Sequence, residues 1–121
     1  LAQHGLEDQA ETINQAAVAV ARRVIDSSFK DVLLAGSVGP LGVRLAPLGR
    51  VPAAEARDAF AEQITALVAS PAEMPGHRGV DLIVVETIPD LTEMAAAVEA
   101  ARQVAPDMPV IERCWAIRLP R

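Results

Sequence analysis

The most informative side chain in the sequence is a carboxylate that directly follows a buried apolar run. Residues 82–85 are apolar without alternation and rich in β-branched side chains, which is typical of a strand buried on both faces in a parallel sheet. Glu86 comes next, and parallel α/β proteins bind their ligands at the carboxyl ends of the strands. Glu86 is therefore the first candidate for contact with a ligand. The residues alone leave open that it points into solvent or pairs with an arginine.

A glycine-rich turn follows a second apolar run, residues 32–37. Gly36, Gly39 and Gly42 are spaced G-x-x-G-x-x-G, which differs from the dinucleotide-binding G-x-G-x-x-G, and no G-K-S/T follows. One interpretation is a tight turn that needs glycine for positive φ. The other is a turn whose backbone passes close to a bound ligand.

The remaining metal-binding or nucleophilic side chains are scattered. We expect His4 to be a surface histidine and His77 to be solvated, since His77 lies in a Pro/Gly-rich loop, residues 70–79, at the opposite end of the sheet from a ligand crevice. For His4 the reason is that no His, Cys or carboxylate cluster accompanies it, and Cys114 is predicted to be an isolated thiol. The sequence therefore assigns no catalytic residue and no metal ligand.

Composition excludes several classes of protein. The 121 residues carry a net charge of −5 and contain no basic stripe that could contact phosphates, so the sequence argues against nucleic-acid binding. The apolar runs fall short of the roughly 20 residues that a membrane span needs. The single cysteine favours a reducing, cytoplasmic setting.

Periodicity predicts three helices and three strands. A helix over residues 8–26 should bury one apolar face, and two further helices should cover residues 52–68 and 91–105. The expected buried faces are Ile13, Ala17, Val20 and Val24; Ala56, Phe60, Ile64 and Leu67; and Leu91, Met94, Val98, Ala101 and Ala105. Asp90 and Glu93 form a D-x-x-E helix start, with Glu93 expected on the outer side. Strands are expected at 32–37, 82–85 and 110–112.

This alternation predicts an α/β fold of parallel βα units with right-handed crossovers. A complete (β/α)8 TIM barrel takes about 250 residues, so we expect a part of one, about strands 3 to 5 with their helices. Residues 1–121 should form this partial domain, with 113–121 as an atypical tail that shows neither a strand period nor a helix cap. Open sheet edges would permit self-association.

Two segments together resemble the homocysteine S-methyltransferase family. They are the A-G-S-V-G-P-L-G turn at residues 35–42 and the V-D-L-I-V-V-E-T strand end at residues 80–87. Residues 1–7 with Ile13 and Asn14 also look like the family's segment after its second strand. The likeness extends to about Val110, which corresponds to roughly the second to fifth βα units of the family's barrel.

The resemblance implies transfer of a methyl group to the sulfur of homocysteine, which gives methionine. In the family, zinc turns the homocysteine thiol into a thiolate and is held by cysteines late in the barrel, which this chain does not contain. By position, Glu86 would accept hydrogen bonds from the homocysteine ammonium, and Ser37, Gly39 and Thr87 would line the same pocket. The isolated chain is then expected to be inactive, with the methyl donor left open.

Two other interpretations remain. The chain could be a piece of a different (β/α)8 or doubly wound enzyme whose Glu86 serves another amine or hydroxyl substrate. It could also be a non-catalytic α/β module that buries its open strand edges against a partner chain.

Overall fold

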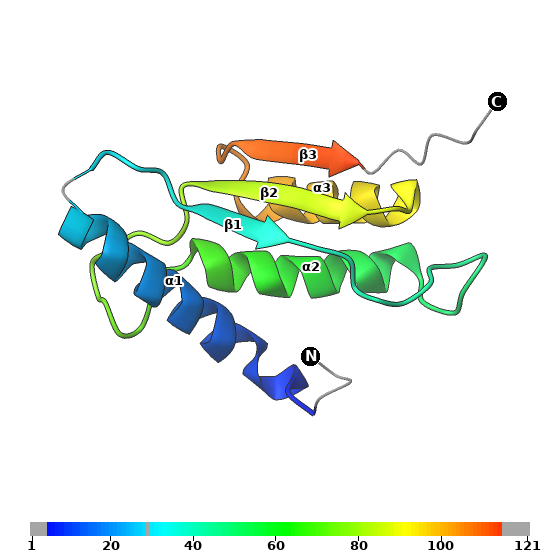
Figure 1. Ribbon diagram of the computed structural model, residues 1–121. Helices are drawn as coiled ribbons and strands as arrows, with labels where there is room; N and C mark the ends of the chain where they lie inside the picture. Colours follow the sequence, from blue (N-terminus) through cyan, green and yellow to red (C-terminus); the bar gives the residue numbers. More distant parts are fainter. Residues whose placement is uncertain (1–4, 29, 115–121) are drawn as a thin grey trace.

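The structure is a computed structural model of the chain, and it describes residues 5–28 and 30–114 (Figure 1). In chain order the elements are η2 (Glu7–Gln9), α1 (Ala10–Ser28), β1 (Ala35–Val38), α2 (Ala53–Val68), β2 (Leu82–Ile88), α3 (Leu91–Val104) and β3 (Val110–Cys114). The alternation of helix and strand that the sequence predicts is confirmed.

The three strands form one parallel sheet in the order β1-β2-β3. Val38 pairs with Val85, and Ile83 pairs with Val110, so the carboxyl ends of the strands lie at the same edge (Figure 1). The fold class is therefore α/β with parallel βα units, consistent with part of a TIM barrel. Because β1 and β3 are the outer strands of the described sheet, self-association through them stays a prediction.

Helices α2 and α3 cover one face of this sheet (Figure 1). Helix α2 buries the face that its periodicity predicts, because long and small apolar residues recur every three or four positions. Its predicted stripe is buried in full: Ala56, Phe60, Ile64 and Leu67. These side chains share the core with Val38, Ile83, Val85 and Ile88.

Strand β2 is longer than expected, and it is buried on one face rather than two. Ile83, Val85 and Ile88 are buried against the helices, whereas Leu82 and Val84 are only partly buried. Within the described residues the covering helices α2 and α3 both lie on the same side, so the expectation of burial on both faces is not met in this part of the chain.

The buried face of α1 differs from the predicted one. Ile13, Val20 and Val24 are exposed, as is Ala17, and the buried side chains are Val18, Ala19 and Arg22. Helix α1 packs against α2, and its rotation also brings Arg22 to Asp81 at the amino-terminal end of β2. The position of the partner helix and this ion pair therefore set the buried face, and the apolar stripe does not.

Helix α3 begins where its cap predicts, but its faces are partly misassigned by the sequence pattern. The Asp90 side chain accepts from the backbone N–H groups of Thr92 and Glu93, which confirms the helix start. Leu91 is exposed and Glu93 is buried, the reverse of the prediction. Met94 and Ala101 are buried as expected, whereas Val98 and Ala105 are partly buried.

Two strand boundaries also shift. Strand β1 begins at Ala35, because the preceding Val32 and Leu33 are exposed and run outside the sheet. Strand β3 extends to Cys114, beyond the expected end at Glu112. Residues 115–121 of the predicted tail lie outside the described part of the chain.

Candidate functional site

Ser37 and Glu86 meet at the carboxyl ends of β1 and β2. Ser37 pairs in register with Val84, so Glu86 lies two residues further along β2 on the same face of the sheet. The Ser37 hydroxyl donates to Glu86 Oε1 at 2.8 Å. The face that carries this bond is the one that α2 and α3 leave uncovered (Figure 1). The sequence-predicted pair is thus brought together at the expected edge.

Thr87 interrupts β2 immediately after Glu86. Its φ is 64°, in the left-handed region that a β-branched residue rarely adopts, and the register with β3 shifts between Glu86 and Ile88. Such irregularities re-aim neighbouring side chains and occur often beside functional sites. The Thr87 side chain is exposed at this edge.

The glycines of the turn after β1 have different roles. Gly42 has a φ of 77°, so the turn interpretation applies to it. Gly39 faces open space, because an added Cβ would meet only the carbonyl oxygen of Glu86, at 4.0 Å. Gly39 therefore leaves room beside Glu86 for the close approach of a ligand.

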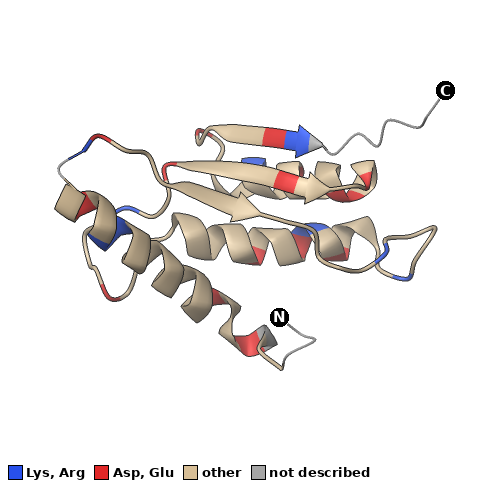
Figure 2. Ribbon diagram, viewed as in Figure 1, with Lys and Arg blue, Asp and Glu red and all other residues tan. Residues whose placement is uncertain are grey.

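The charge around Glu86 leaves the carboxylate available. Within residues 5–28 and 30–114, no ion pair joins Glu86 to a basic side chain. Arg113 stands opposite Glu86 in the β2–β3 register, and an acidic and a basic segment follow one another near the end of β3 (Figure 2). The arginine-pairing alternative for Glu86 is not realised in this part of the chain.

A cavity of about 410 Å³ lies next to the site and shares only Gly39 with it. Its walls come from the turn at Gly39, Pro40 and Leu41 and from helices α1 and α2, and neither Ser37 nor Glu86 lines it. The candidate site is therefore the exposed surface at the carboxyl ends of β1 and β2 rather than this cavity.

The described residues do not fit a zinc ion. Within this part of the chain, no group of three or more His, Cys, Asp or Glu side chains is arranged to hold a metal. His77 is half exposed and its Nε2 lies 3.3 Å from Asp26 Oδ2, in the loop before β2. His4 lies outside the described residues. We assign no metal ligand to this part of the chain.

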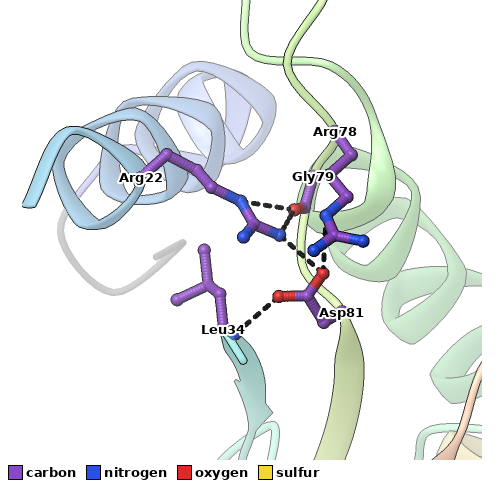
Figure 3. Close-up of polar contacts among 5 residues, drawn as sticks. All are labelled: Arg22, Leu34, Arg78, Gly79 and Asp81. Carbon is purple, nitrogen blue, oxygen red and sulfur yellow. Dashed lines mark hydrogen bonds and ion pairs between the residues drawn. The ribbon is translucent and has the colours of Figure 1, made fainter. Parts of the chain in front are cut away.

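A second polar cluster, which sequence reasoning missed, lies at the opposite, amino-terminal end of the strands (Figure 3). Asp81 Oδ1 lies 2.9 Å from Arg22 Nη2 and 2.8 Å from Arg78 Nε. Asp81 Oδ2 accepts from the Leu34 N–H at 2.7 Å, and Arg22 also donates to the Gly79 carbonyl. Asp81 and Glu86 are the two carboxylates of the V-D-x-x-x-x-E-T motif, and they lie at opposite ends of β2.

The surroundings of Asp81 keep its carboxyl group ionised. Burial by itself raises the pKa of Asp81, but the guanidinium of Arg22, the Leu34 N–H and the charge of Arg78 lower it by more, so the pKa lies below its ordinary value. This cluster ties α1, β1 and β2 together and stands apart from the candidate site. The sequence offered two signals for this cluster: Arg22 lies in the middle of an expected helix, and Asp81 directly precedes an apolar run.

Helices long and apolar enough to cross a lipid bilayer do not occur in the described part of the chain.

Comparison with known proteins gives the family. The homocysteine S-methyltransferase family matches residues 1–117. The chain is also similar to methionine synthase of Mycobacterium tuberculosis, with 33% identity over 106 residues, which is 85% of this chain and 8% of that protein. The chain thus spans a small share of the length of this relative. Since the match covers nearly the whole chain, and the two motifs that resemble the family lie side by side at the strand ends, the chain belongs to the homocysteine S-methyltransferase family.

Proposed function

We propose that this chain supplies the ammonium-binding side of a homocysteine pocket, with Glu86 as the acceptor. The observation that carries this proposal is the Ser37–Glu86 hydrogen bond at the joined carboxyl ends of β1 and β2. It occupies one oxygen of the carboxylate and holds the side chain beside the open space at Gly39. The other oxygen is then oriented for a donor on the ligand.

The chemistry of the pair suits an amino acid. A carboxylate that accepts from an ammonium group makes a short, charge-assisted bond, stronger than a bond between neutral groups. Ser37 orients the acceptor, and the missing side chain of Gly39 lets the ligand approach the backbone. Thr87 turns the strand away directly after Glu86 and lines the same edge.

In this proposal the parent domain transfers a methyl group to zinc-activated homocysteine thiolate, which gives methionine. The zinc is bound outside the described residues, and the methyl donor is bound elsewhere in the domain. The isolated chain is therefore expected to show no methyl transfer, and turnover by the purified chain with zinc and a methyl donor would contradict this.

Ligand titration of the ¹⁵N-labelled chain, followed by NMR, tests the role of Glu86. L-homocysteine should shift the backbone amides of Ser37, Gly39 and Glu86, and 4-mercaptobutanoate, which lacks the ammonium group, should bind more weakly. Glu86→Gln removes the charge and should weaken L-homocysteine binding about tenfold or more, since bonds to charged groups contribute roughly 1.5–3 kcal/mol. The same substitution should leave 4-mercaptobutanoate binding unchanged.

The matched control is Glu112→Gln. Glu112 pairs with Val85 in register, so its exposed side chain lies near the same strand ends but on the other face of the sheet. This variant should bind L-homocysteine as the unmodified chain does. Equal binding of the two ligands, or equal losses in the two variants, would refute the proposal.

A further inference from the structure

Glu93 is a buried carboxylate that the proposed pocket does not use. It lies in the first turn of α3 with 4% of its surface exposed, and its Oε1 accepts from the backbone N–H of Leu41 at 2.7 Å. Leu41 belongs to the turn that follows β1 and precedes α2. The bond therefore joins two segments that are far apart in the sequence.

The cap of α3 is made without this side chain. Asp90 accepts from the N–H groups of Thr92 and Glu93, which satisfies two of the free donors at the start of α3. In a capping box the Glu at this position would turn back to the N–H of the N-cap residue, but here it extends to another loop. Burying a carboxylate is costly unless its hydrogen bonds are specific, so the contact with Leu41 has to be explained by its effect on that loop.

The turn that contains Leu41 also contains Gly39, a residue of the proposed pocket. Leu41 follows Gly39 by two residues, and Ser37 of the same segment donates to Glu86. Two carboxylates from the β2–α3 segment thus hold the end of β1 and the turn that follows it: Glu86 through Ser37, and Glu93 through Leu41. The first bond is exposed at the site, whereas the second is partly buried.

We propose that Glu93 is a positioning residue, which fixes the Gly39–Leu41 turn so that Ser37 and Gly39 stay aligned with Glu86. It acts through the Leu41 amide and does not touch the ligand. The inference rests on the proposed function for its effect on homocysteine, but the fixed turn itself is independent of any ligand.

Hydrogen exchange of the Leu41 amide, measured by NMR on the full chain, tests the contact directly. Glu93→Ala should lower the protection of Leu41 tenfold or more relative to the amides of β2, because its acceptor is gone. Glu93→Gln keeps an uncharged acceptor of the same size, so protection should fall only about fivefold. Glu99→Ala, on the exposed side of the same helix, should leave Leu41 protection unchanged within twofold.

The effect on the pocket is measured separately. The amide shifts of Ser37 and Gly39 should change in Glu93→Ala and be largely restored in Glu93→Gln, and L-homocysteine binding should weaken about tenfold in the first variant. If Glu93→Ala does not fold, the fivefold loss of Leu41 protection in Glu93→Gln, with β2 unchanged, decides the question.

Unchanged Leu41 protection in a folded Glu93→Ala chain, or pocket shifts equal to those in Glu99→Ala, would overturn the proposal. A chain that shows the Leu41 effect but binds no L-homocysteine would confirm the positioning of the turn and refute only the proposed function.

Discussion

Adjacent arginines on α1 allow a sharp test of the buried cluster. Arg22 and Asp81 have side chains that are each 5% exposed, with 2.9 Å between Nη2 and Oδ1. The next residue, Arg23, pairs with Glu73 at 2.6 Å, but these side chains are 53% and 61% exposed. Arg22→Ala and Arg23→Ala therefore each remove one ion pair from the same helix; the Arg22 pair is buried, and Arg22→Ala also removes the hydrogen bonds to the Gly79 carbonyl.

The structure sets the expected magnitudes. Removing one partner of a buried ion pair costs about 3–5 kcal/mol, because the other charge is left buried and unpaired. After Arg22→Ala, Asp81 still contacts Arg78 at 2.8 Å and the Leu34 N–H, so we expect the lower end, about 3 kcal/mol. Arg23→Ala breaks an exposed pair and should cost about 0–1 kcal/mol. A typical domain has only about 5–15 kcal/mol of stability, so the first loss is large.

Urea denaturation followed by far-ultraviolet circular dichroism measures both losses. With an m-value of about 1–3 kcal/mol/M, the Arg22→Ala midpoint should fall by about 1–3 M, and the Arg23→Ala midpoint by at most about a third as much. Should Arg22→Ala fail to fold, the double variant Arg22→Met with Asp81→Leu removes both charges and should recover most of the stability.

Equal midpoints for Arg22→Ala and Arg23→Ala would refute the reasoning, because burial would then make no difference. A double variant no more stable than Arg22→Ala would also contradict it, since the loss would come from packing of the arginine stem rather than from the stranded charge.

Two further predictions concern single residues. The pKa of Asp81 is lower in the folded chain than in the unfolded chain, where it is about 3.9. The ionised Asp81 carboxylate therefore contributes its full stabilisation above about pH 3.9, and this contribution is lost as the pH falls through the lower pKa of the folded chain. Below about pH 4 the urea midpoint should fall more steeply in the unmodified chain than in Asp81→Asn. Thr87→Gly relieves a residue at φ 64° and should raise stability by about 0.5–1 kcal/mol in the same urea assay while weakening L-homocysteine binding. Thr65→Gly, at an exposed position within α2, is its control and should lower stability, and a loss of stability in Thr87→Gly would count against strain at that position.

The sequence was sufficient for the parts of the fold that depend on neighbours along the chain. The stripe of α2, the cap of α3 at Asp90 and the order of strands and helices all follow from local periodicity and local hydrogen bonding. Glu86 at a strand end was predictable from the sequence pattern, whereas Ser37 beside it was expected only from the family resemblance. Homocysteine as the ligand rests on the family and on the proposal above.

Only the tertiary structure decided which faces and side chains the packing would use. The apolar stripe of α1 is exposed because the helix turns Arg22 toward Asp81, and Glu93 is buried because the turn after β1 presents the Leu41 N–H to it. Asp81 and Glu86 belong to one motif, yet Asp81 pairs at the amino-terminal end of β2 and Glu86 lies near its carboxyl end. Each of these contacts joins segments about 50 or more residues apart. Their partners are set by how the layers meet in space, and local propensity carries no information about that.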